Sequence, residues 1–100
     1  MENEITEQQI AEWKQRYARV FHLQVGDKEC YLKMPDRTIL GFATKVSSED
    51  GNPLKFNEVL LQNCWLAGDE EIKKDDSYFF GASSKLDKLL AFKEADLKEL

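Results

Sequence analysis

Two kinds of hydrophobic periodicity alternate along the chain, and the first is helical. In residues 6–18 the apolar positions recur at intervals of three and four, the period of a helix that buries one face. Thr6 and Gln9 stand three residues apart, as in a capping box, where each side chain bonds the other residue's backbone N–H. The stripe consists of Ile10, Trp13 and Tyr17. It predicts an N-terminal helix that packs on the core, with a recognition surface as the alternative interpretation.

The pattern then changes to a period of two. Apolar and polar residues alternate over residues 19–25 and again over 29–34, as they do in strands with one buried face. Gly26-Asp27 separates the two runs, and glycine can adopt the positive φ of a tight turn. We therefore predict a two-stranded antiparallel hairpin. Its apolar face must be covered by helices, because two strands alone are only marginally stable. The residues on that face are Phe21, Leu23, Cys30 and Leu32.

The segment after the hairpin has two interpretations. Asp36 follows Pro35 and can cap a helix over residues 37–47, with apolar side chains at helical spacing. Residues 38–42 could equally form a third strand, since Gly41 weakens a helix by about 1 kcal/mol relative to alanine. The pattern favours the helix but leaves the strand open.

A further helix has a clear start. Asn52 is a strong N-cap, and Pro53 at the first helical position loses no hydrogen bond. The apolar content of the following residues predicts a central helix that runs to Trp65. Gly68 is expected to close it as a left-handed C-terminal cap.

The last segment has the most regular pattern. Asp75-Asp76 supplies an N-cap for a helix over residues 77–100, which would be about 36 Å long. Positions spaced four and three apart form a heptad seam with two polar interruptions: Phe79, Ser83, Leu86, Leu90, Lys93, Leu97 and Leu100. We expect its proximal half in the core. The distal half packs either on its own domain or on a partner, since chain ends fray unless docked. The candidate protein-binding residues are therefore Phe79, Leu86, Leu90, Leu97 and Leu100.

Together these elements predict a single α+β domain over residues 1–100. The N-terminal helix and hairpin occupy residues 6–34, and the helical part occupies residues 36–100, where three helices pack on the hairpin and the last is long. A chain of 100 residues with 42% hydrophobic content can bury roughly two-thirds of its unfolded surface. It should therefore fold without disulfides or metal ions.

Charge and hydropathy narrow the choice of partners. The net charge of −5 disfavours nucleic acid, which needs a basic face. No segment approaches the roughly 20 apolar residues of a membrane span, and the acidic residues 1–5 lack the features of a secretory signal. Cys30 and Cys64 lie far apart in apolar patterns, which favours buried free thiols, with a disulfide as the alternative. We expect a cytoplasmic protein that binds neither nucleic acid nor membrane.

Candidate chemistry is sparse. His22 is the only histidine, and local spacing gives it no catalytic partner. The acidic clusters at residues 49–50, 69–71 and 75–76 do not match the ligand spacing of a calcium loop, and no phosphate-binding loop is present. The sequence therefore predicts a protein that is not an enzyme and holds no metal or cofactor. A small-molecule pocket lined by aromatics is the weaker alternative.

Several short stretches follow one another in a distinctive order over most of the chain. They are Glu12-Trp13-Lys14, Tyr31-Leu32-Lys33-Met34-Pro35-Asp36-Arg37, Lys55-Phe56-Asn57-Glu58, Asn63-Cys64-Trp65, Gly68-Asp69-Glu70-Glu71-Ile72, and the closing Phe79-Phe80, Leu86, Leu89-Leu90 and Lys93-Glu94-Ala95. In this order they resemble small phage and prophage proteins of the tail assembly chaperone type. None of these stretches is a catalytic signature.

The resemblance implies a fold and a role. Such proteins have a small β element followed by helices, and they act in the cytoplasm of a bacterial host. They bind the long helical tape-measure protein of a tailed phage, keep it soluble before the tube forms around it, and help to recruit tube subunits. The resemblance carries no binding residue over to this chain. From the residues alone, the alternative is a structural or adaptor domain that self-associates into a homo-oligomer through the seam.

Overall fold

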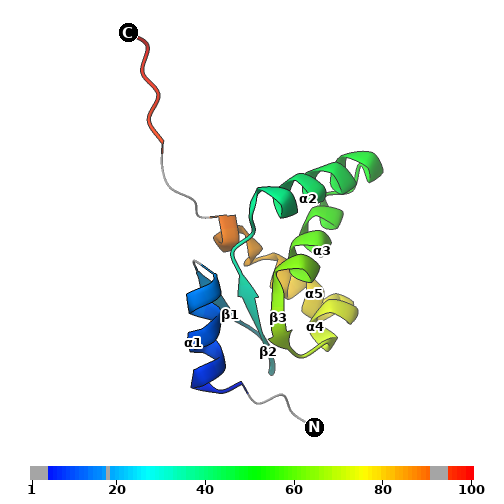
Figure 1. Cartoon of the computed structure of the whole chain (residues 1–100). Coiled ribbons are helices and arrows are strands. Elements are labelled where there is room, and N and C mark those ends of the chain that lie inside the picture. Colours follow the sequence, from blue (N-terminus) through cyan, green and yellow to red (C-terminus); the bar gives the residue numbers. More distant parts are fainter. Residues whose placement is uncertain (1–4, 18, 91–94) are drawn as a thin grey trace.

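The fold is a three-stranded antiparallel sheet with helices on both faces (Figure 1). The computed structural model describes residues 5–17, 19–90 and 95–100. The elements in chain order are α1 (Glu7–Arg16), β1 (Val20–Val25), β2 (Lys28–Lys33), α2 (Arg37–Asp50), α3 (Pro53–Cys64), β3 (Trp65–Gly68), α4 (Glu71–Lys74), α5 (Asp76–Ser83) and the 3-10 helix η1 (Leu86–Leu90). The predicted α+β class is confirmed. The predicted two-stranded sheet is wrong, because β3 joins it.

The N-terminal helix and the hairpin form as predicted. The Gln9 N–H donates to Thr6 Oγ1 at 3.1 Å and the Thr6 N–H donates to Gln9 Oε1 at 3.0 Å, so both bonds of the capping box are present. In the hairpin Val25 pairs with Lys28. Gly26 has φ +62°, and Asp27 has no positive φ. This is the pattern of a type II′ turn, whose twist suits a hairpin.

Residues 37–50 form a helix, which decides between the two interpretations of that segment. Asp36 Oδ1 accepts the Ile39 N–H at 2.9 Å, and Gly51 ends the helix with φ +64°. Gly41 is tolerated because its side of α2 is open, with nothing within 4 Å of an added Cβ. α3 starts at Pro53 as predicted, and Asn52 Oδ1 accepts the Leu54 N–H at 3.1 Å.

The predicted role of Gly68 is wrong. The chain leaves α3 directly into β3, so residues 65–68 pair with β2 instead of closing a helix. Gly68 has φ +144°, outside the left-handed helical region, and lies opposite Cys30. A Cβ at this position would lie 2.5 Å from Cys30 Cβ and 2.7 Å from the Glu29 carbonyl oxygen. Glycine is therefore required by the close approach of two backbones.

The prediction of a long C-terminal helix over residues 77–100 is also wrong. α5 ends at Ser83, where the Lys85 N–H bonds the Ala82 carbonyl at 3.0 Å and the backbone tightens toward a 3-10 turn. In η1 the two most buried side chains, Leu86 and Leu89, are three residues apart, which is one turn of a 3-10 helix. The core is therefore filled by Leu86 and Leu89, and not by a continuous helical stripe of residues spaced four and three apart. Of the predicted seam, Lys93 lies outside the described residues.

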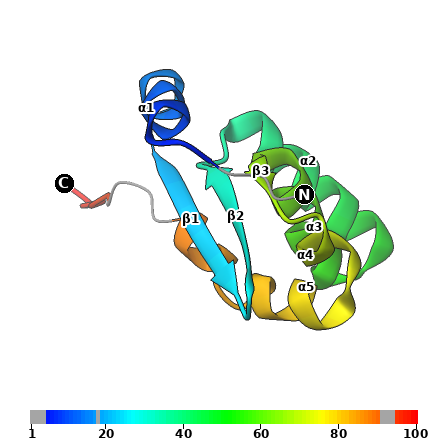
Figure 2. The same ribbon diagram turned by 90° about the horizontal axis from the view of Figure 1, so that it is seen from below.

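The core lies between the inner face of the sheet and the helices α2 to α5 with η1. α1 lies over the opposite face of the hairpin (Figure 2). The buried residues are Cys30, Leu32, Ala43, Val59, Leu60, Leu61, Cys64, Ile72, Phe79, Ala82, Leu86 and Leu89. Both cysteines are buried free thiols, as predicted. In the described part of the chain, no helix has the length and apolarity to cross a membrane.

Candidate functional site

The five predicted binding residues lie in two different environments. Phe79 and Leu86 are buried in the core, and Leu90 packs against it, which confirms the prediction for the proximal half. Leu97 and Leu100 are fully exposed, and the other residues from 95 to 100 are exposed as well. The five side chains therefore do not form one continuous surface. Of these five predicted binding residues, Leu97 and Leu100 are the two whose side chains are exposed to another molecule.

One edge of the sheet is open. β1 pairs with β2 on one side only, because the strand order is β1-β2-β3. The Met34 N–H donates to the Arg19 carbonyl at 3.3 Å, and bonding alternates along an antiparallel pair. The N–H and C=O groups of Val20, His22 and Gln24 therefore point away from β2. Within the described ranges, no backbone hydrogen bond joins this side of β1 to another segment.

A groove runs beside the open edge, between β1 and η1. We call it the β1 groove; its volume is about 280 Å³. Its apolar lining is Phe21, Leu23, Leu32, Leu86 and Leu89. Exposed Lys85, which directly precedes η1, and exposed Lys88 of η1 also line it, and the Arg19 guanidinium lies over the Phe21 ring at 5.2 Å. The groove is thus apolar inside and basic at its margin.

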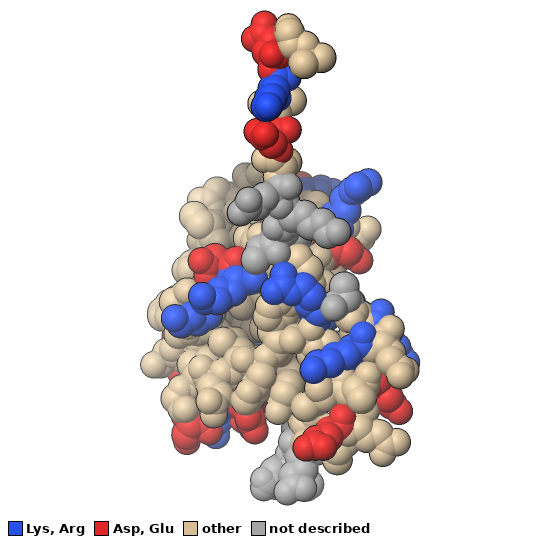
Figure 3. Space-filling view, turned by 90° about the vertical axis from the view of Figure 1, so that its left-hand side faces the viewer, with Lys and Arg blue, Asp and Glu red and all other residues tan. Residues whose placement is uncertain are grey.

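The wider surface around the β1 groove has the same charge. Figure 3 looks onto the side of the molecule where β1 and α1 lie. Lysine and arginine side chains gather across the middle of this face, above a broad uncharged area. In a protein of net charge −5, this is a local reversal of sign, and it would attract an acidic ligand.

The outer face of the hairpin holds an aromatic row. The Trp13 ring of α1 lies 5.7 Å from Tyr31, and the His22 imidazole stacks on Tyr31 at 4.7 Å. His22 Nε2 lies 2.7 Å from Glu29 Oε1. Among the described residues, no hydroxyl or thiol side chain hydrogen-bonds this histidine. α1 has no buried residue, so its stripe covers the outer face of the hairpin instead of entering the core.

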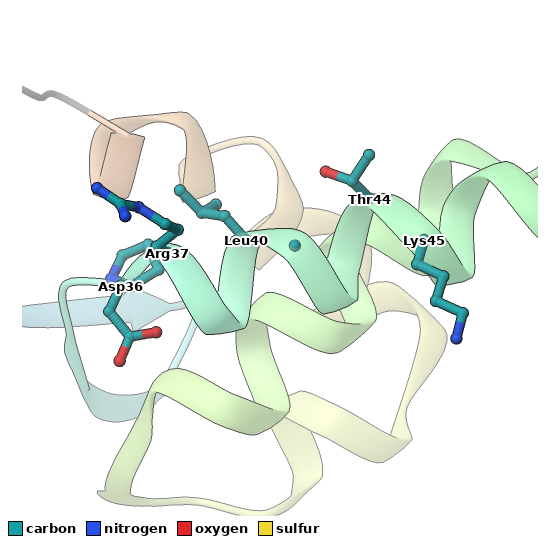
Figure 4. Close-up of a pocket in the computed structure, with 7 residues that line it drawn as sticks. Asp36, Arg37, Leu40, Thr44 and Lys45 are labelled. Atoms are coloured by element: carbon teal, nitrogen blue, oxygen red, sulfur yellow. The ribbon is translucent and has the colours of Figure 1, made fainter.

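A second groove, shallower and more open, lies along α2. It has a volume of about 680 Å³ and is mostly apolar; Arg37 and Leu40 lie near each other at the start of α2, and the Lys45 side chain points away from them farther along the helix (Figure 4). Phe42 on the same helix is 51% exposed. We call this the α2 groove; its lining consists of Pro35, Asp36, Arg37, Leu40, Gly41, Thr44 and Lys45.

Groups that could carry chemistry are used structurally. Burial raises the pKa of Cys30 to about 12 and that of Cys64 to about 11, so neither thiol is activated as a nucleophile. Asp75 Oδ1 caps α5 by accepting the Ser77 N–H at 2.9 Å, and Asp69 Oδ2 accepts the Glu29 N–H at 3.0 Å. The described residues contain no group of three or more histidine, cysteine or acidic side chains that could hold a metal ion.

The three comparisons with known proteins gave no match. No family model, curated protein or solved structure matched this chain. Functional reasoning therefore rests on the residues and on the surfaces described above. Sequence reasoning missed the open edge and the β1 groove, because both depend on strand order and on the turn after α5. The run of six uncharged residues at 20–25 was the available signal.

Proposed function

We propose that this protein is a non-enzymatic protein-binding domain that acts as a phage tail assembly chaperone in the cytoplasm of a bacterial host. Its partner would be the long helical tape-measure protein. The observation that carries the proposal is the full exposure of Leu97 and Leu100 in the C-terminal segment. The resemblance of the ordered sequence stretches supports the choice of partner.

Residues 95–100 have no regular secondary structure, but their sequence suits an amphipathic helix that forms against a partner. Leu97 and Leu100 are three residues apart, and Asp96, Lys98 and Glu99 fill the other positions. Exposed leucines lose apolar contact with water when a second helix covers them, at roughly 25 cal/mol per Å² of buried surface. A partner with an apolar helical stripe supplies that cover. The negative net charge of the domain would keep the complex soluble.

Co-expression tests this proposal. The protein is produced together with the long helical protein encoded beside it, and co-purification from clarified lysate is measured. The double variant Leu97→Asp, Leu100→Asp should lose the complex. A matched control, Ala95→Asp with Lys98→Gln, makes the same change in charge but keeps both leucines, and should retain it.

Two results would contradict the proposal. Equal co-purification of both double variants would show that the leucines make no contact, and a genomic neighbourhood without tail genes would remove the proposed partner. Light scattering on the purified protein separates the alternative. If the wild type forms an oligomer that the leucine variant loses, the segment serves self-association instead.

A further inference from the structure

The geometry points to a second binding surface that is independent of the C-terminal leucines. We propose that the open edge of β1 and the β1 groove form one docking site for an extended, acidic segment of another protein. The segment would add to the sheet as a fourth strand beside β1. This inference goes beyond the proposed function, because it uses a different surface and a different partner conformation.

The backbone supplies the first argument. Three residues of β1, Val20, His22 and Gln24, direct their N–H and C=O groups outward, and in the described part of the chain no backbone group bonds them. An added strand satisfies such groups through the same ladder that joins β1 to β2. Docking of this kind needs no particular sequence, but it needs an extended conformation in the partner.

The edge lacks the features that normally block such pairing. Natural sheets protect an exposed edge with a lysine, a proline or a bulge. The six residues of β1 include no lysine, arginine, acidic residue or proline, and their register with β2 is regular. The irregularity in this sheet lies instead between β2 and β3, at Tyr31 and Leu32. β1 is therefore left competent to accept a partner.

The β1 groove supplies selectivity. Side chains alternate between the two faces of a strand, so every second side chain of an added strand would lie above Phe21 and Leu23, over the groove. The apolar lining there suits an apolar side chain. Lys85 and Lys88 at the margin suit an acidic side chain at a neighbouring inward position.

The charges also decide against a second copy as the occupant. Two copies paired antiparallel through β1 would share one continuous sheet and bring Lys85 and Lys88 of both copies onto the same face. Like charges on one face of a joint sheet oppose association. An acidic segment from a different protein meets no such repulsion.

A designed peptide tests the site. The probe is a short acetylated peptide in which valine alternates with serine and glutamate stands near both ends, and its binding is followed by fluorescence anisotropy at about 0.15 M salt. In two further peptides, N-methyl groups remove the backbone N–H groups of alternate residues. One peptide loses the N–H groups along one edge of the strand, and the other loses those along the opposite edge. Only one of them should bind at least about tenfold more weakly, because only one edge donates its hydrogen bonds to β1.

Charge variants test the groove. The double variant Lys85→Glu, Lys88→Glu should weaken peptide binding about tenfold, since two exposed ion pairs are lost and become repulsive. The control Lys45→Glu, Lys74→Glu has the same net charge but changes exposed lysines away from the β1 groove. It should stay within about twofold of the wild type.

Several outcomes would overturn the docking site. They are no binding up to about 1 mM peptide, equal effects of the two N-methylated peptides, or equal effects of the two lysine pairs. Protection of the Val20, His22 and Gln24 amides from hydrogen exchange in the free protein would also overturn it. It would show that a second copy or another part of the same chain already bonds this edge. The Leu97→Asp, Leu100→Asp variant should bind the peptide as tightly as the wild type does. The peptide result therefore tests the docking site even if the proposed function is wrong.

Discussion

The two edges of the sheet are built in opposite ways. At the β3 edge, backbone contact with β2 is so close that only glycine fits at residue 68, and Asp69 continues the ladder by bonding both backbone groups of Glu29 at 3.0 Å. Ile72 of α4 is fully buried behind it. At the β1 edge, no residue of the strand is fully buried and the outward backbone groups are open. The β3 edge is held by close backbone contacts with β2, whereas in the described residues no backbone group bonds the outward side of β1.

Substitution of Gly68 should have the largest effect. Gly68→Ala places a methyl group against the backbone of β2 at a positive φ, so neither strand can move away cheaply. We expect a loss of about 4 kcal/mol or more in the free energy of unfolding, measured with urea. Gly41→Ala is the control: it meets nothing within 4 Å and should stabilise α2 by about 0.5–1 kcal/mol. Similar results for the two would contradict the close packing at this edge.

Thiol labelling tests how well β3 protects its neighbour β2 from solvent. Cys30 of β2 is fully buried and its pKa is raised to about 12, from an ordinary value of 9.0. Its thiolate fraction at mild pH is therefore about 1000-fold lower than in the unfolded chain. Burial also raises the pKa of Cys64 to about 11, so both thiols should label much more slowly in the native protein than after unfolding. Labelling of Cys30 at the unfolded rate would show that β3 does not hold the edge closed.

Two leucines in the hairpin compare the central strand β2 with the edge strand β1. Leu32 of β2 is buried and pairs with Trp65, whereas Leu23 of β1 is only partly buried. Leu32→Ala should cost about 3 kcal/mol and Leu23→Ala about 1 kcal/mol, because the cavity at Leu23 opens to solvent. Urea unfolding of both variants gives the comparison. Equal losses would mean that the edge strand β1 is as tightly packed as the central strand β2.

The smallest effect is expected at the hairpin turn, where α5 anchors β1. The Tyr78 hydroxyl donates to Asp27 Oδ1 at 2.6 Å, and this bond lowers the pKa of Asp27. A lowered carboxyl pKa stabilises the fold above the ordinary value of 3.8, and the contribution disappears as pH falls through the lowered pKa. Tyr78→Phe should therefore be slightly less stable than the wild type near neutral pH and equal to it in strong acid. If an NMR titration of Tyr78→Phe shows that the pKa of Asp27 is still lowered as in the wild type, the hydrogen bond from Tyr78 is not its cause.

Local signals in the sequence predicted much of the fold. The capping box at Thr6, the Gly26-Asp27 turn and the Asn52-Pro53 start are each confirmed at the expected residues. In each case the signal and its hydrogen-bond partner lie within a few residues of one another. Local chemistry therefore fixes the element without help from distant contacts.

The errors fall where distant contacts decide the structure. β3 is four residues long and exists because β2 pairs with it, and the short apolar run at 65–67 also suits the end of a helix. The 4-3 spacing after Phe79 suits a long helix, but the core takes Leu86 and Leu89 from a 3-10 turn. The β1 groove is lined by residues of this 3-10 turn and of the hairpin, so a pattern read as one long helix could not reveal it.

Amide hydrogen exchange along β1 in the free protein is the most direct test of the central claim. The account predicts alternation: the amides of Val20, His22 and Gln24 exchange rapidly, and those of Phe21, Leu23 and Val25 are protected by their bonds to β2. Addition of the acidic peptide should protect the first set and leave the second unchanged. Uniform protection of all six amides in the free, monomeric protein would contradict an open edge.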